Sequence, residues 1–258
     1  PGVRTDIAGN ARPAGLGYDI GASEAPGIWY RSVGRDSRDL SSGGTVDISS
    51  TTKTATFSAA QPDNVGVGDI IQYGGAGYYQ AAVIYSRSSS TSYRVLSPAG
   101  GTPTATTSAA FSIYRAHTTL NDWESQWNGN VNSSLDSDLH DQVLLPSMDL
   151  TASNSAAFAA CYASTSPDQA GVAIDDFSNN DWTTGTSTYI KVYTPDTITE
   201  AGTSQRHNGI WDESAYRIEY AGRVIETQRD TVFEGLQIYQ AGSSEDGIRV
   251  SGDTAPHI

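Results

Sequence analysis

The sequence Ser-Gln-Arg-His at residues 204–207 holds the side chains best suited to bind an acidic sugar. A guanidinium pairs with a carboxylate, and an indole ring stacks on the apolar face of a sugar ring. Arg206, His207 and the nearby Trp211 therefore form a candidate ligand-binding cluster. The alternative is a surface loop that Arg206 and His207 fix by hydrogen bonds to the backbone.

A second candidate is the oxygen-rich segment that precedes Trp182. Asp175, Asp176 and Asp181, together with two asparagines between them, supply the oxygen ligands that Ca²⁺ prefers. Their spacing fits neither an EF-hand nor the nonapeptide calcium repeat. A solvated turn rich in Asp and Asn is therefore the alternative, and calcium is the one cofactor that the sequence suggests.

No catalytic motif accompanies these candidates, and we name no catalytic residue. The sequence lacks H-E-x-x-H, G-x-S-x-G and any zinc-type spacing of cysteine and histidine. The sequence Val-Gly-Val-Gly-Asp at residues 65–69 predicts a turn that leads into a strand, because glycine permits the backbone angles of a turn. A phosphate-binding loop would need a helix and a lysine directly after the motif, and neither follows. Cys161 is the only cysteine and lies in an apolar run, so we expect it to be buried and inert.

Composition excludes several classes of protein. The 258 residues include 15 Lys and Arg against 29 Asp and Glu, which gives a net charge of −14. A nucleic-acid-binding protein needs basic residues to neutralise phosphates, so we expect no nucleic-acid partner. No apolar run is long enough to span a bilayer, so we expect no membrane insertion. The acidity fits an extracellular or cell-surface location, and Pro1 in place of an initiator Met suggests a piece of a longer protein.

The pattern of turn residues and short apolar runs predicts an all-β fold. The 26 glycines and the many Ser, Thr, Asn and Asp residues favour turns between short strands. Residues 29–116 contain six strand-like runs, which predict a small antiparallel barrel or sandwich. These runs are residues 45–48, 54–58, 69–73, 79–86, 92–96 and 111–115.

The only helix that the sequence predicts lies near residues 118–128. Leu120, Trp123 and Trp127 fall at helical spacing, and Thr118 or Asn121 can cap the first turn. Residues 151–258 return to short strand-like runs, without a strict repeat of 20–25 residues.

Both ends of the chain resemble bacterial right-handed parallel β-helix proteins. Residues 4–13 and 18–24 are similar to the closing coil of such a helix, and residues 231–238 and 245–250 to its opening coils. Five internal segments resemble, in a consistent order, the N-terminal region of large bacterial β-helix surface proteins. These segments are residues 33–40, 66–73, 113–120, 189–195 and 204–211.

The resemblance implies right-handed parallel β-helix coils with a short helical cap and an inserted small antiparallel β domain. Residues 1–28 then form a closing coil or linker, residues 29–116 the inserted domain, and residues 117–258 the helical cap and the opening coils. The charged residues at positions 35–39 would anchor the inserted domain through ion pairs.

The leading functional hypothesis is a non-enzymatic structural or adhesive module of an exported surface protein, such as a stalk or filament subunit. Its partners would be other copies or modules of the same parent protein, because an uncovered coil end leaves apolar core exposed. We expect residues 1–24 and 231–258 to make these contacts. The rivals are a polysaccharide lyase or hydrolase on a β-helix scaffold, and a carbohydrate-binding module centred on residues 29–116. A pair of carboxylates facing a groove beside an arginine, with aromatic platforms, would favour the enzyme.

Overall fold

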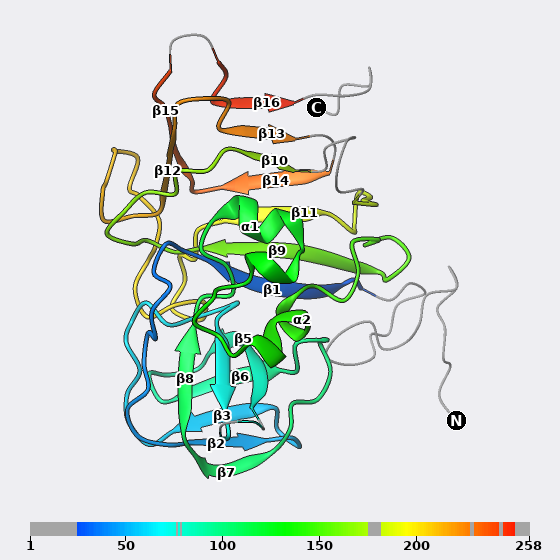
Figure 1. The fold of residues 1–258 in the computed structure, drawn as a ribbon, viewed down its shortest axis with the longest axis vertical. Coiled ribbons are helices and arrows are strands. Elements are labelled where there is room, and N and C mark those ends of the chain that lie inside the picture. Colours follow the sequence, from blue (N-terminus) through cyan, green and yellow to red (C-terminus); the bar gives the residue numbers. More distant parts are fainter. Residues whose placement is uncertain are drawn as a thin grey trace.

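The protein consists mostly of β-strands, with a few helical turns (Figure 1). The computed structural model describes residues 25–75, 77, 79–174, 182–227, 230–242 and 245–250. The all-β class that the composition predicts is confirmed. Antiparallel strands occupy the lower part of Figure 1 and parallel strands the upper part. The segment 1–24, predicted as a closing coil, lies outside the described residues.

The antiparallel region is a seven-stranded sheet in the order β7-β2-β3-β6-β5-β4-β8. Its edge strands, β7 and β8, are separated in sequence by Ala110 alone, so the sheet must curl until its two edges approach each other. The enclosed core includes Phe57, Tyr93 and Phe111. The strands are β2 (Val46–Ser49), β3 (Thr54–Phe57), β4 (Ile70–Tyr73), β5 (Gln80–Arg87), β6 (Ser92–Leu96), β7 (Thr106–Ala109) and β8 (Phe111–Tyr114).

Each of the six predicted runs in this region overlaps a strand, whereas β7 has no counterpart among the predictions. Strands that were predicted, such as β3 and β8, alternate buried residues with more exposed ones and so bury one face. β7 reads Thr-Thr-Ser-Ala and buries none of its residues fully, so its sequence lacks the apolar alternation that indicates a strand.

Three parallel sheets form the other region, in the orders β1-β9-β11-β14, β10-β13-β16 and β12-β15. β1 lies at the start of the predicted segment 29–116, yet it pairs with β9 along its whole length. The strands are β1 (Gly27–Val33), β9 (Ser155–Cys161), β10 (Val172–Ile174), β11 (Ile190–Tyr193), β12 (Arg217–Tyr220), β13 (Ile225–Thr227), β14 (Thr231–Glu234), β15 (Gln237–Gln240) and β16 (Ile248–Val250).

Strand β9 is buried on both faces because its side chains are small. Ala157, Ala159 and Cys161 face the core enclosed by the parallel sheets. The intervening residues, including Phe158, face a second core that Val67 and Tyr193 share. This two-sided burial suits a central strand of a parallel sheet. The predicted burial of Cys161 is confirmed, and burial raises the pKa of its thiol.

The predicted helix is present as α1 (Leu120–Ser125), but its cap differs from the expectation. Thr119, rather than Thr118 or Asn121, is the N-cap, and its hydroxyl accepts a hydrogen bond from the Asp122 amide at 3.0 Å. α1 packs against β1, β9 and β10. Three short helical turns follow, in a segment where the sequence predicts no further helix: η1 (Asn128–Asn130), η2 (Ser137–Leu139) and α2 (His140–Val143).

The two regions meet at residues 65–69, the Gly-containing motif that the sequence predicted as a turn. A Cβ atom on Gly66 would lie 2.0 Å from the Glu200 carbonyl oxygen. Gly68 has φ +85°, and a Cβ atom there would lie 2.5 Å from the Ser32 amide nitrogen. Glycine is therefore required at both positions, because backbone segments of the parallel region approach this turn too closely for a side chain.

A buried ion pair fixes this joint. Arg115 Nη1 donates to both carboxylate oxygens of Asp69, at 2.6 and 2.7 Å, and both side chains are excluded from solvent. The guanidinium lies 3.6 Å from the centre of the Tyr162 ring. The Tyr162 hydroxyl in turn donates to the Val67 carbonyl at 2.8 Å. These contacts thus join the antiparallel sheet to Tyr162, the residue that directly follows β9.

Among the charged residues at positions 35–39, Arg38 and Asp36 pair with each other and not with the parallel region. Arg38 is 83% exposed and pairs with Asp36, two residues away. This pair is local, since its members belong to one surface turn. The anchoring ion pair is instead Asp69 with Arg115, which are distant in sequence.

Replacing Arg115 with methionine should lower the free energy of unfolding by about 3–5 kcal/mol, because the Asp69 carboxylate would remain buried without its cation. The change is measured by urea denaturation, with Arg38→Ala as the control. The control should cost less than about 0.5 kcal/mol, as expected for an exposed pair. Equal losses for the two variants would contradict the assigned role of Arg115.

Candidate functional site

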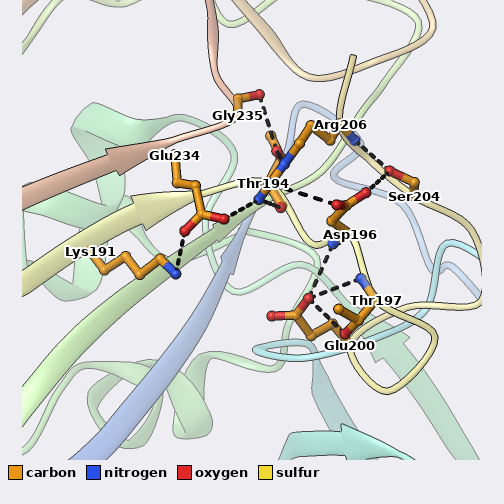
Figure 2. Close-up of polar contacts among 9 residues, drawn as sticks. All are labelled: Lys191, Thr194, Asp196, Thr197, Glu200, Ser204, Arg206, Glu234 and Gly235. Carbon is orange, nitrogen blue, oxygen red and sulfur yellow. Dashed lines mark hydrogen bonds and ion pairs between the residues drawn. The ribbon is translucent and has the colours of Figure 1, made fainter. Parts of the chain in front are cut away.

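Arg206, the first residue of the predicted sugar-binding cluster, contacts acceptors of its own chain (Figure 2). Its Nη2 atom donates to Glu234 Oε1 at 2.6 Å and to the Thr194 carbonyl at 3.2 Å. Its Nη1 atom lies 3.7 Å from a carboxylate oxygen of Asp196. This geometry matches the alternative interpretation, a loop fixed by Arg206. The sugar-binding role stays a prediction.

Glu234, the last residue of β14, receives a second cation from β11. Lys191 Nζ lies 2.6 Å from Glu234 Oε2, while Arg206 holds the other carboxylate oxygen (Figure 2). Lys191, Arg206 and Glu234 are called the Glu234 clamp below. The two cations hold the pKa of Glu234 below its ordinary value. The clamp therefore fixes the end of β14 on β11 and on the loop that contains Arg206.

Gly235 allows the chain to turn directly after the clamp. Its φ is +73°, and a Cβ atom there would lie 2.3 Å from Thr194 Oγ1 and 2.4 Å from Arg206 Nε. Instead, the Thr194 hydroxyl donates to the Gly235 carbonyl at 3.1 Å. A side chain at this position would displace Thr194 and Arg206, and Arg206 is part of the clamp.

His207 and Trp211 have neighbours different from those of Arg206. The His207 Nδ1 atom accepts a hydrogen bond from the Gly209 amide at 3.0 Å, within its own turn. Trp211 is half-exposed and packs edge-on against Tyr239 of β15, with ring centres 6.1 Å apart. Arg206 thus belongs to the Glu234 clamp, whereas Trp211 pairs with Tyr239, an aromatic residue of β15.

The predicted calcium ligands Asp175, Asp176 and Asp181 lie outside the described residues, so this expectation stays a prediction. Among the residues that the structure describes, no group of three or more His, Cys, Asp or Glu side chains is arranged to hold a metal ion. No helix in the described part of the chain is long and apolar enough to cross a bilayer.

Two buried titratable groups, His117 and Asp168, contact groups of the fold itself. His117 is fully buried, which lowers its pKa to about 3, and its Nδ1 atom lies 3.1 Å from the Asn130 carbonyl oxygen. Asp168 accepts hydrogen bonds from the Leu120 amide at 2.7 Å and from the Tyr216 hydroxyl at 3.1 Å. Asp168 thereby binds the first residue of α1, and burial raises its pKa.

The strands β14, β15 and β16 are consecutive in sequence, and each is the last strand of its parallel sheet. Within the described residues, each of them pairs with another strand on one side only. Together they are called the C-terminal strand edge, and they lie in the upper part of Figure 1. This edge carries exposed apolar side chains, namely Val232, Tyr239, Ile248 and Val250. An unpaired strand edge with apolar side chains can add a further strand.

The segments 231–238 and 245–250 overlap these strands, but the first of them spans both β14 and β15, and sequence reasoning missed the Glu234 clamp. Lys191 and Glu234 lie in two of the segments that carry the resemblance, 189–195 and 231–238, but the sequence alone does not link these distant segments. They come together because β11 pairs in parallel with β14, with Tyr193 opposite Glu234. Only the strand register could have indicated this contact.

Comparisons of the chain with protein-family models, with curated proteins and with solved structures give no match. The resemblance to bacterial β-helix surface proteins therefore stays a prediction.

The Glu234 clamp should make stability depend on pH. The folded state binds a proton on Glu234 more weakly than the unfolded chain does, because the pKa of Glu234 lies below its ordinary 4.5. The clamp therefore stabilises the fold above pH 4.5, and this contribution is lost as pH falls through the lowered pKa. Glu234→Gln should cost about 0.5–1 kcal/mol near neutral pH, and much less at about pH 3.

The measurement is urea denaturation of the native protein and of the variant across this pH range. Glu213→Gln, at an exposed residue outside the clamp, is the matched control and should show no such trend. A stability difference for Glu234→Gln that stays constant from neutral to acid pH would argue against the clamp.

Proposed function

We propose that the chain is a non-enzymatic structural module of an exported surface protein, and that its parallel strands are coils of a β-helix. The observation that supports this proposal most strongly is the order of the strands. β11, β12 and β13 come one from each parallel sheet, and β14, β15 and β16 then visit the sheets in the same order. A chain that visits three sheets repeatedly in one order winds in coils.

An earlier pass of the chain follows the same order. β9 precedes β11 in the first sheet, and β10 precedes β13 in the second. Between β9 and β10, Asp168 forms an isolated parallel bridge to Ile218 of β12. Three successive passes thus stack on one another, and their inward side chains form one core with α1.

The two ends of this stack differ in what covers them. β1 lies against the antiparallel region, through the joint at residues 65–69 and through contacts with β5. At the other end, the C-terminal strand edge presents backbone groups and apolar side chains. Water can hydrogen-bond to the backbone groups but does not compensate for exposed apolar surface.

We infer that the C-terminal strand edge binds β structure of another copy or module of the parent protein. In solutions of this chain, the partner is a second copy. A contact between unlike surfaces would propagate head to tail and form a filament or stalk. This arrangement suits an exported module, whose net charge of −14 favours solubility before assembly.

Placing lysine on the C-terminal strand edge should prevent self-association. Lysine residues on an edge strand oppose pairing because their charges would have to be buried. The variant carries Val232→Lys and Val250→Lys, two exposed positions on β14 and β16. Sedimentation velocity should show that the native chain associates as its concentration rises to about 0.1 mM, and that this variant stays monomeric.

Ile198→Lys is the control, because Ile198 is as exposed as Val250 but lies in a loop away from this edge. The control should associate as the native chain does. A native chain that remains monomeric over the whole range, or association that both variants retain, would contradict the proposal.

A further inference from the structure

An open, polar hollow of about 410 Å³ in the surface, called the cavity below, lies beside β10 and β13. Along these strands Val172, Ile174 and Ile225 point into the core, so the intervening Ala173 and Glu226 face outward. The two outward residues are opposite each other in the parallel register and line the cavity. The small Ala173 side chain leaves space next to Glu226, and this space belongs to the cavity.

The ring of Tyr220 is held rigidly at the side of this cavity. A Cβ atom on Gly171 would lie 2.7 Å from the ring, and one on Gly222 would lie 2.8 Å from it. The ring therefore packs directly on two stretches of backbone that carry no side chain. It remains 38% exposed, so part of its surface is available to a ligand. A fixed and partly exposed aromatic ring is suited to stacking against another flat surface.

The polar wall of the cavity is built around Arg223. Its Nη1 atom donates to Glu226, and its Nη2 atom lies 3.6 Å from a carboxylate oxygen of Glu245. The Nε atom of Arg223 is buried and has no acceptor within the described part of the chain. Because this atom is excluded from solvent, a ligand can reach Arg223 only through the rest of its side chain, which is 29% exposed.

These groups define the class of ligand. Two carboxylates and one guanidinium leave a net negative charge, which disfavours a uronate or another anion. The carboxylates accept hydrogen bonds, while the partly exposed Arg223 guanidinium and the side-chain amide of Asn121, which also lines the cavity, donate them. A sugar hydroxyl both donates and accepts, and a sugar ring has an apolar face that stacks on an aromatic ring.

We propose that this cavity, formed by Tyr220, Arg223, Glu226 and Glu245, is a binding site for a neutral sugar residue of a polysaccharide. Tyr220 supplies the stacking surface, and the glutamates and Arg223 bind hydroxyl groups. Both carboxylates face the same guanidinium rather than each other across a sugar bond, so we propose binding without hydrolysis. The site stands on its own geometry and does not depend on the C-terminal strand edge.

The test is isothermal titration calorimetry of the whole chain with defined oligosaccharides at about 1 mM. The neutral probes are hexamers of β-1,4-glucose, β-1,4-xylose, β-1,4-mannose and β-1,4-galactose, and the anionic probe is oligogalacturonate. At least one neutral probe should bind in preference to the anionic one. Tyr220→Ala should weaken this binding about tenfold, whereas Tyr220→Phe should retain it, because stacking needs the ring alone.

Two further variants separate the site from the rest of the surface. Glu245→Ala should weaken binding, and Tyr239→Ala, which removes an exposed ring on β15 outside the cavity, should leave it unchanged. Circular dichroism checks that each variant is folded. Failure of every neutral probe to bind, preferential binding of oligogalacturonate, or binding that depends on Tyr239 and not on Tyr220 would each overturn the proposal.

Discussion

The contact on which the rest of the structure depends is the buried pair of Asp69 and Arg115. It lies where a curled antiparallel sheet meets parallel strands. At such a junction, neither region alone supplies hydrogen-bond partners for all of the backbone groups that meet there. The Asp69 carboxylate also accepts a hydrogen bond from the Gly66 amide at 2.9 Å. The pair therefore sets the shape of the turn at residues 65–69, and this turn sets the position of β1.

The position of β1 determines the strands that stack on it. β9 pairs with β1, β11 with β9 and β14 with β11, so the register established at the joint continues to the far side of the molecule. Along this series the means of stabilisation changes. Close packing of small side chains holds β9, whereas the partly exposed Glu234 clamp holds β14. The strands farthest from the joint are thus the ones held by the weaker, solvent-screened interactions.

The sequence predicts the strands of this fold better than it predicts their contacts. Alternating burial marks β3 and β8, and helical spacing of Leu120 and Trp123 marks α1. Thr119 was missed as the cap because Thr118 precedes it, and a choice between adjacent threonines depends on backbone angles. Arg115 directly follows β8 and its partner Asp69 directly precedes β4, so no local pattern in the sequence links the two residues.

The candidate site shows the same limit. The residue types of Arg206 and Trp211 suggested one binding cluster, but loop geometry gives them different neighbours. The cavity beside Tyr220 was not foreseen, because Gly171 and Glu245 are distant in sequence and meet only through the parallel register. A site formed by residues of stacked strands is not evident from a sequence without a strict repeat, because such a sequence does not reveal the strand register.

The central inference is that successive passes of the chain stack as coils and end at an edge that a second copy covers. Hydrogen–deuterium exchange of the backbone amides in residues 231–250, at low and at high protein concentration, tests it most directly. We expect these amides to exchange more slowly at high concentration, while those of β4 and β5 exchange at an unchanged rate. Exchange in residues 231–250 that is independent of concentration would contradict the inference.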